Sequence, residues 1–170
     1  MEYTYLGRIG LRVSRLCLGT VNFGMHVSEE DTFPVLNRAL EQGINFFDTA
    51  NGYNSGLTET IIGNWCAQDR SRRDQIVLAT KLYSQTGDGP NDGRLSAYHM
   101  RRACEDSLRR LQTDHIDLYQ MHHIDRHVPW EEIWQGMEQL VSEGKILYVG
   151  SSNFAAWNIA QAQGLATQRN

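Results

Sequence analysis

Five short apolar runs, spaced about thirty residues apart, alternate along this chain with stretches of helical periodicity. The runs occupy residues 16–20, 45–50, 76–81, 117–122 and 146–151. Runs of this length and composition are typical of strands that are buried on both faces. The stretches between them repeat apolar residues at helical spacing, for example at Met100, Ala103, Cys104, Leu108 and Leu111. The alternation predicts βαβ units and a parallel sheet, and therefore an α/β fold.

Residues that favour helix ends stand at the borders of the helical stretches. Ser28 and Ser96 can cap helix N-termini, and Pro129 suits a first helical turn. Gly43 and Gly144 stand where helices are expected to end, because glycine adopts the left-handed conformation at little cost. A fifth helix is predicted over residues 154–165, after the last strand.

Two other segments have a distinct character. Residues 3–13 alternate around two glycines, which predicts a small hairpin before the first strand. Residues 85–94 are rich in Gly, Asp, Asn and Pro, and they make a long connection between the third strand and the third helix. Such strand-to-helix loops lie on the ligand-binding face of open α/β sheets and of barrels. No interdomain linker interrupts the pattern, so residues 1–170 are expected to form one domain.

Composition excludes several classes of partner. The 170-residue chain is 41% hydrophobic and 21% charged, which is ordinary for a globular domain. Because the net charge of −4 is mild and the arginines are scattered, we expect no nucleic-acid or membrane surface. The sequence shows neither a signal peptide nor a membrane-spanning run, which favours a cytoplasmic location. Cys17, Cys66 and Cys104 lack CxxC spacing, and we expect them to be reduced and buried.

Polar residues stand at the ends of three of the predicted strands. Asp48 ends the second strand, Lys81 the third and His122 the fourth, while Tyr53 follows Asp48 after a turn. Because parallel strands end at one edge of a sheet, these side chains are expected to converge. Taken singly, each has an ordinary explanation as a solvated strand end, a hydrogen-bonded structural histidine or a packing tyrosine. Their joint occurrence is what favours an active site.

The four residues form a coherent acid and base set. An isolated tyrosine has a pKa of about 10 and must be shifted toward neutrality to exchange protons efficiently. A Lys81 ammonium near Tyr53 would favour the phenolate, and Asp48 would hold that ammonium in place. His122 could then hydrogen-bond a substrate oxygen. Such a site can give a proton to the alkoxide that develops when a hydride reaches a carbonyl carbon.

Other cofactor and metal chemistries have less support. The first strand and first helix are not joined by a GxGxxG turn, and no GxxxxGK[ST] loop is present, which argues against a Rossmann dehydrogenase and an NTPase. His122, His123, Asp125 and His127 are close in sequence, but strand alternation predicts that His122 and His123 point to opposite sides. We therefore expect no metal site.

Four ordered motifs resemble the aldo-keto reductase superfamily. They are Asp48-Thr49-Ala50-Asn51-Gly52-Tyr53, the strand-end Lys81, Asp117-Leu118-Tyr119-Gln120-Met121-His122, and Gly150-Ser151-Ser152-Asn153-Phe154. The resemblance covers nearly the whole chain. Within the superfamily, the segment Tyr119-Gln120-Met121-His122 followed by Asp125 is more similar to the bacterial and potassium-channel β-subunit-like branches than to the aldose reductase branch. It implies a TIM barrel fold and NADPH as the usual cofactor.

The resemblance also assigns roles to individual residues. Tyr53 matches the general acid, and Lys81, Asp48 and His122 complete a catalytic tetrad. For the cofactor, Ser152 and Asn153 match positions that bind the nicotinamide carboxamide, and Thr20 and Asp48 match positions close to the cofactor. The alternative for Ser152 and Asn153 is an ordinary turn in which Asn153 caps a helix.

The chain is shorter than the fold that the resemblance implies. A TIM barrel needs about 250 residues and eight βα units, whereas five strands are predicted here. We therefore expect a partial (β/α)8 barrel with about five of the eight units. The open sheet edges favour a fragment of a longer protein, with self-association or a complementing C-terminal segment as the alternatives.

The expected function is reduction of an aldehyde or ketone by hydride transfer from NADPH, with a small-molecule carbonyl substrate and Tyr53 as proton donor. NADH remains open as the cofactor. Two alternatives are a cofactor-binding redox sensor that regulates a partner, as is thought for potassium-channel β-subunits, and an inactive truncated chain. The sequence does not identify the physiological substrate.

Overall fold

A parallel sheet of five strands organises the computed structural model, which describes residues 1–169. The strands are β3 (Cys17–Gly19), β4 (Phe46–Asp48), β5 (Val77–Leu82), β6 (Ile116–Met121) and β7 (Ile146–Ser151). They pair in the order β3-β4-β5-β6-β7, so each strand lies beside its neighbour in the chain. In the part of the chain that the structure describes, the sheet is open, with β3 and β7 at its edges. The predicted parallel sheet and partial barrel are confirmed.

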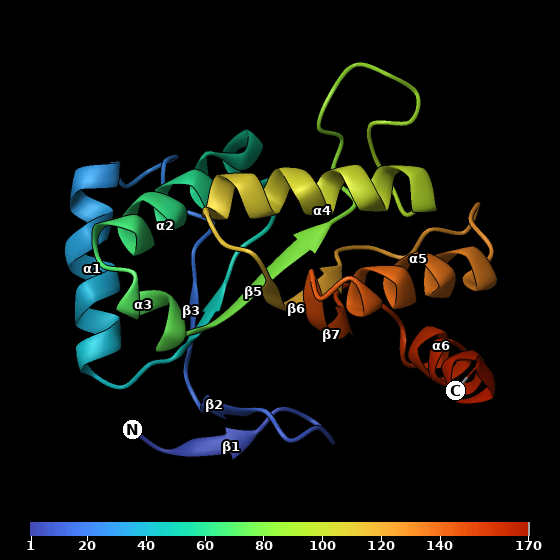
Figure 1. Cartoon of the computed structure of the whole chain (residues 1–170), viewed down its shortest axis with the longest axis horizontal. Helices are drawn as coiled ribbons and strands as arrows, with labels where there is room; N and C mark the ends of the chain where they lie inside the picture. The colour runs from blue at the N-terminus through green and yellow to red at the C-terminus, as the bar shows by residue number, and fades with distance from the viewer. Residues whose placement is uncertain (170) are drawn as a thin grey trace.

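Helices follow the strands along an arc outside the sheet (Figure 1). They are α1 (Glu29–Glu41), α2 (Leu57–Gln68), the short α3 (Ser71–Asp74), α4 (Ala97–Leu111), α5 (Trp130–Ser142) and α6 (Ala156–Arg169), with a 3-10 turn, η1 (Tyr53–Gly56), before α2. The core lies between this layer and the outer face of the sheet, and its large side chains include Leu36, Phe47, Trp65, Leu78, Met100 and Tyr119. Burial of these apolar side chains is what holds the two layers together.

The predicted helix ends are largely correct. The Ser28 hydroxyl accepts a hydrogen bond from the Asp31 amide at 3.1 Å, and the Ser96 hydroxyl accepts one from the His99 amide at 3.2 Å. Gly43 and Gly144 have positive φ angles of 79° and 70°, as a glycine after a helix requires.

Two predicted helix boundaries are wrong by a few residues. Pro129 lies just outside the first turn of α5, because it adopts an extended conformation with ψ of 143° as the residue before Trp130. The last helix begins at Ala156 rather than at residue 154 and runs to Arg169. Its late start follows from Asn153, whose left-handed φ of 55° interrupts the chain path after β7.

The predicted N-terminal hairpin is present and lies below the sheet in Figure 1. Its strands are β1 (Tyr3–Tyr5) and β2 (Arg12–Ser14), which pair antiparallel. The Ser14 amide donates to the Asn45 side chain at 2.7 Å, and the Asn45 amide donates to the Ser14 hydroxyl at 3.2 Å. Because Asn45 directly precedes β4, these bonds fix the hairpin to the end of the sheet where the strands begin.

The cysteines differ from the prediction at one position. Cys66 and Cys104 are buried, and burial raises the pKa of their thiols to about 11 and about 12. Cys17 is exposed, so its predicted burial is wrong. It lies on the edge strand β3, opposite Phe46 in the register, and therefore on the face of the sheet that the helices do not cover. All three cysteines are free thiols.

A buried charge cluster joins the sheet to α2 and α4. The Thr80 hydroxyl donates to the Glu59 carboxylate at 2.5 Å, and Arg110 binds the other Glu59 oxygen at 2.7 Å. The Glu59 side chain is fully buried, so its charge is tolerated only because both oxygens have partners. The two helices approach closely here, since a Cβ atom at Gly63 would lie 2.2 Å from the Arg110 carbonyl oxygen.

We therefore expect Gly63→Ala to lower the free energy of unfolding by about 1–3 kcal/mol, because α2 and α4 would have to separate. Gly164→Ala is the matched control, since a Cβ atom in that part of α6 would meet open space. The control should be unchanged or more stable by about 0.5–1 kcal/mol, as alanine favours helix. Urea unfolding measures both variants. Equal stability of Gly63→Ala and the wild type would contradict the close packing.

Candidate active site

The structure brings the four strand-end residues together around the Lys81 ammonium. Its Nζ atom lies 2.6 Å from the Asp48 carboxylate and 3.2 Å from the Tyr53 hydroxyl. It also lies 4.9 Å from the centre of the Tyr53 ring. The His122 ring meets the same tyrosine edge to face, with 5.8 Å between the ring centres. The predicted convergence of these side chains at the strand ends is therefore observed.

The ammonium has a complete set of acceptors. Besides the oxygens of Asp48 and Tyr53, Nζ donates to the Thr49 carbonyl at 2.8 Å. An ammonium has three protons and no lone pair, so all three are used and the Tyr53 oxygen must act as an acceptor. The phenol proton of Tyr53 then remains available to a group on its other side. The arrangement is that of a proton donor whose conjugate base a cation would stabilise.

Burial strengthens the interaction between these charges. The Lys81 side chain is 6% exposed and the Asp48 side chain 26% exposed. Electrostatic attraction is larger at partly buried sites than in water, because the effective dielectric constant is lower. Asp48 offsets the cost of burying Lys81, and the Thr49 carbonyl contributes a further hydrogen bond.

The turn that carries Tyr53 is fixed by a close approach of two loops. A Cβ atom at Gly52 would lie 2.1 Å from the Ser84 hydroxyl oxygen, so only glycine fits there without movement. The two residues that follow Tyr53 both adopt the left-handed conformation, with φ of 46° at Asn54 and 54° at Ser55. The Tyr53 amide donates to the Ala50 carbonyl at 3.1 Å. The Tyr53 side chain thus projects from a tight turn, and this turn is held against the loop that follows β5.

His122 is partly buried beside the cation. Burial, followed by the positive charge of Lys81 and then by His123, lowers the pKa of His122 below the ordinary value of 6.5. Its Nδ1 atom is buried without a hydrogen-bond partner. Both features favour a neutral imidazole.

The expected directions of His122 and His123 are wrong. Their rings stack with an interplanar angle of 19° and 5.1 Å between centres, rather than pointing to opposite sides. Strand alternation does not apply, because β6 ends at Met121 and the chain turns there. Within residues 1–169, no group of three or more His, Cys, Asp or Glu side chains is arranged to hold a metal ion.

Gln120 belongs to the same cluster, although the sequence did not single it out. Its side-chain amide donates to the second Asp48 oxygen at 2.9 Å. One available signal was strand alternation within β6, which turns Gln120 to the face opposite that of the buried core residue Tyr119. The partner on β4 could be identified only from the structure.

The residues predicted to contact a cofactor lie around this cluster. Asn153 donates from its side chain to the His122 carbonyl at 2.9 Å and to the Ser152 hydroxyl at 3.2 Å. The Ser152 amide donates to the Met121 carbonyl at 2.8 Å. Thr20 is fully buried and donates its hydroxyl to the Asp48 carbonyl at 3.0 Å. Ser152 and Asn153 are thus fixed beside His122, and Thr20 supports the strand that carries Asp48.

The long loop of residues 85–94 closes on itself above α4 (Figure 1). The Thr86 amide donates to the Asp92 carbonyl, and the Arg94 amide donates to the Tyr83 carbonyl, both at 2.8 Å. The buried Asp125 accepts from the Leu95 amide at 3.3 Å. This bond joins the loop after β5 to the loop after β6, on the face where the strands end.

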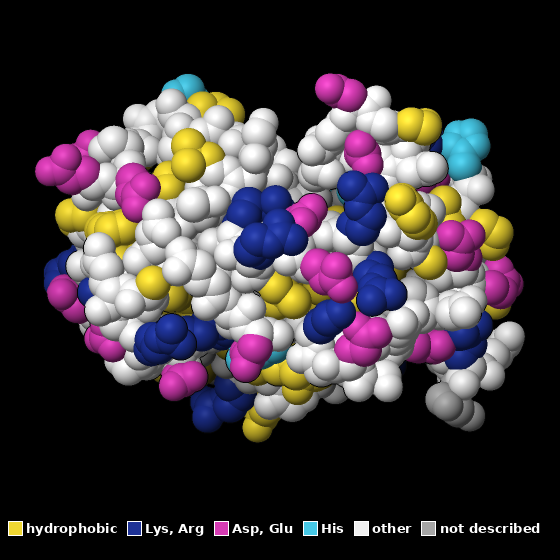
Figure 2. All heavy atoms as spheres, turned by 45° about the horizontal axis from the view of Figure 1, so that its top comes forward, with side chains coloured by type: hydrophobic (Ala, Val, Ile, Leu, Met, Phe, Trp, Pro, Cys, Tyr) yellow, Lys and Arg dark blue, Asp and Glu magenta, His cyan; other side chains and the backbone are white. Residues whose placement is uncertain are grey.

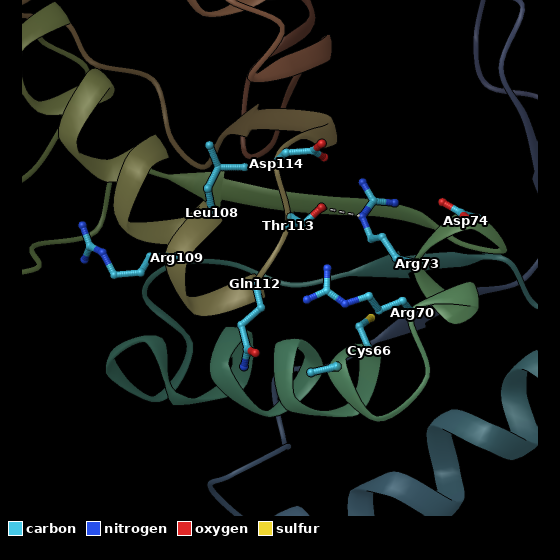
Figure 3. Close-up of a pocket in the computed structure, with 10 residues that line it drawn as sticks. Cys66, Arg70, Arg73, Asp74, Leu108, Arg109, Gln112, Thr113 and Asp114 are labelled. Carbon is cyan, nitrogen blue, oxygen red and sulfur yellow. Dashed lines mark hydrogen bonds between the residues drawn. The ribbon is translucent and has the colours of Figure 1, made fainter.

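A cavity of about 590 Å³ lies elsewhere, between α2, α3 and α4 (Figure 3). Its charged lining residues are Arg70, Arg73, Asp74, Arg109 and Asp114. Arg73 also pairs at 2.8 Å with Asp117, which is near the start of β6. The cavity is therefore at the opposite end of the strands, and none of the four candidate residues lines it. The candidate site is therefore identified from the types and contacts of its side chains, and not from the volume of a cavity.

The outer face carries charges of both signs. Figure 2 shows basic and acidic side chains interspersed over α2 and α4. Several are paired, for example Arg102 with Asp92 at 2.9 Å and Arg109 with Asp106 at 2.8 Å. Exposed pairs of this kind add little to stability. Among the helices of residues 1–169, none has the length and apolar character needed to cross a membrane.

Two of the curated proteins that resemble this chain are named as an oxidoreductase and a reductase. The chain is 60% identical over 177 residues to the uncharacterized oxidoreductase YrpG of Bacillus subtilis, covering 99% of this chain and 54% of that protein. It is 33% identical over 189 residues to versiconal hemiacetal acetate reductase of Aspergillus parasiticus, covering 98% of this chain and 55% of that protein. The chain thus spans about half the length of these curated relatives.

The match to a protein family extends over almost the whole chain. The sequence model of the aldo/keto reductase family matches residues 15–169, which include all five strands of the parallel sheet. Proteins of this family generally use NAD(P)H. The family resemblance that the motifs indicated is therefore confirmed, and the chain belongs to the aldo/keto reductase family.

Proposed function

We propose that the full-length protein reduces an aldehyde or ketone to an alcohol with NADPH, and that Tyr53 is the proton donor. The observation that carries this proposal is the hydrogen bond from the Lys81 ammonium to the Tyr53 oxygen, at 3.2 Å. That bond leaves the phenol proton free and places a positive charge where a phenolate would form. The name of one relative, a reductase, supports reduction as the reaction class.

The proton transfer follows from this geometry. A substrate carbonyl oxygen beside Tyr53 would accept a hydrogen bond from the phenol. When bound, NADPH supplies the hydride that makes this oxygen an alkoxide. Tyr53 gives its proton to the oxygen, and its own oxygen becomes a phenolate that Lys81 stabilises. Asp48, which lies 2.6 Å from the ammonium in this structure, would hold Lys81 in place during the transfer.

His122 would orient the carbonyl by donating a second hydrogen bond. Its Nδ1 atom is buried without a partner, and burying an unpaired acceptor costs less than burying an unpaired N–H. The proton of the neutral ring is therefore assigned to Nε2. A neutral donor suits this role, because the proton needed for the reaction comes from Tyr53.

Ser152 and Asn153 would hold the nicotinamide carboxamide. After their internal bonds, the Ser152 hydroxyl can still donate and the Asn153 side-chain oxygen can still accept. A carboxamide has one acceptor oxygen and a donor NH2 group, so the two residues fit it. Thr20 and Asp48 would lie close to the cofactor, as the family resemblance implies. NADH meets the same requirements and is the alternative cofactor.

Tyr53→Phe removes the proposed acid while keeping the ring. We expect kcat for carbonyl reduction to fall by about 10²- to 10⁴-fold, the usual size of a general-acid contribution. NADPH binding, measured by fluorescence titration, should stay within a few-fold. Tyr5→Phe is the control, because Tyr5 is exposed on β1, in the hairpin at the end of the sheet where the strands begin. Undiminished activity of Tyr53→Phe with several aldehydes would show that another group supplies the proton.

A single-turnover experiment separates an enzyme from a redox sensor. Wild-type protein loaded with NADPH is mixed with an aldehyde, and oxidation of the bound cofactor is followed. An enzyme oxidises it at a rate consistent with kcat, whereas a sensor would leave it reduced. The first result is expected, because the proton-transfer residues are all present and in contact.

The pKa of His122 provides a test that needs no turnover. We expect an NMR titration of its imidazole to give a value below 6.5, and Lys81→Met to raise that value by removing a nearby positive charge. The shift should be partial, since burial is the larger cause. His122→Gln identifies the resonance. A pKa unchanged by Lys81→Met would contradict the electrostatic contact between the two side chains.

A further inference from the structure

The two oxygens of Asp48 have different partners. Lys81 binds Oδ2 at 2.6 Å, and the Gln120 side-chain amide donates to Oδ1 at 2.9 Å. The carboxylate is thus held at both ends, by a cation from β5 and by a neutral donor from β6. Hydrogen bonds to a carboxylate are stronger than those between neutral groups.

The strand register places Gln120 for this contact. Gln120 lies opposite Lys81, and Asp48 lies opposite Ala79. The amide therefore reaches from β6 across β5 to β4. It can do so because Ala79, on the same face of β5, has only a methyl group in the way.

A glycine on the other side leaves room for the same side chain. Gly150 lies opposite Gln120 on β7. A Cβ atom at Gly150 would approach the Gln120 Cγ atom to 3.0 Å, which is closer than ordinary contact. Ala79 on β5 and Gly150 on β7 are thus both small, and they leave space for the extended Gln120 side chain.

The direction of the amide is determined by charge. A carboxylate oxygen can accept but not donate a hydrogen bond, so the NH2 group of Gln120 must face Asp48. Its carbonyl oxygen would be repelled at this distance. The contact therefore stabilises Asp48 as an anion, which is the form that binds Lys81.

We propose that Gln120 is a positioning residue for carbonyl reduction, which holds Asp48 so that Lys81 stays directed at Tyr53. The proposal rests on the proposed function of the full-length protein. Gln120 touches neither the tyrosine oxygen nor the lysine ammonium in the hydrogen bonds of the described chain. It acts through the orientation and charge of one carboxylate.

Several titratable side chains surround Asp48 and would respond if its hydrogen bond from Gln120 were removed. Lys81 faces it from β5, and Tyr53 and His122 lie beside that cation. Cys17 faces it from β3, where partial enclosure by neighbouring atoms and the Asp48 charge raise the pKa of the thiol to about 11 and keep it neutral, although the residue is in contact with solvent. Without Gln120, the unshared negative charge would draw Lys81 toward Asp48. The phenolate of Tyr53 would then be less stabilised.

Gln120→Met tests this effect, because methionine has a similar length and no donor. We expect kcat to fall by about tenfold to a hundredfold, as for loss of a hydrogen bond to a charged group. KM for the carbonyl should stay within about twofold, since Gln120 makes no proposed substrate contact. The alkaline limb of the kcat profile should move to higher pH, because the proton on Tyr53 is held more tightly.

Gln120→Glu separates a hydrogen-bonding role from a merely structural one. A carboxyl group beside Asp48 is protonated at a higher pH than usual, because two adjacent carboxylates repel. While protonated, it can donate to Asp48 as the amide does. We therefore expect activity to recover as the pH falls and to be lost as the pH rises through this ionisation. The wild type should lack this limb.

Gln139→Met is the matched control, because Gln139 is exposed on α5 and bonded to Glu143. It should leave kcat unchanged.

The proposal is wrong if Gln120→Met retains wild-type kcat while Tyr53→Phe is inactive, a result that leaves the proposed function intact. It is also wrong if activity is lost with no change in either pH profile. If Tyr53→Phe and Gln120→Met are both fully active, the proposed function itself fails. Should Gln120→Met not fold, as judged by circular dichroism, the Gln120→Glu profile decides.

Discussion

The Lys81 ammonium is the centre on which the rest of the site depends. Its three acceptors are Asp48, Thr49 and Tyr53, all within one short segment that begins with the last residue of β4, while the lysine itself comes from β5. Moving either strand along the other would break all three bonds at once. The parallel register that places Asp48 opposite Ala79 is therefore a condition for the chemistry as well as for the fold.

Strand alternation gives the sheet two different faces, one that packs against the helices and one that carries the candidate site. Phe47, Leu78 and Tyr119 point to the helices and are buried in the core. Residues one position away, such as Asp48, point to the other face. A slip of one residue would exchange the two sets and place charges in the apolar core. Packing between helices and sheet thus specifies the register that the site requires.

Much of this arrangement could be predicted, because it depends on local pattern. The five strands, the hairpin, the caps at Ser28 and Ser96 and the convergence of the strand-end residues followed from periodicity and spacing. The bond between Gln120 and Asp48 could not, since it depends on a register between strands far apart in the sequence. The exposure of Cys17 could not be predicted from local pattern either, because it arises where the face of the open sheet opposite the helices lacks a covering layer. The prediction that His122 and His123 point to opposite sides also failed, because β6 ends at Met121 and strand alternation does not extend beyond it.

The end of β7 connects the proposed cofactor residues to the residues of the proposed proton transfer. The Ser152 amide binds the Met121 carbonyl, and the Asn153 side chain binds the His122 carbonyl. Asn153 can turn back in this way because it adopts a left-handed conformation, which asparagine tolerates better than most residues. The backbone that positions the His122 ring is therefore held by the residues proposed to bind the carboxamide. Orientation of the carbonyl and placement of the nicotinamide would then depend on the same few hydrogen bonds.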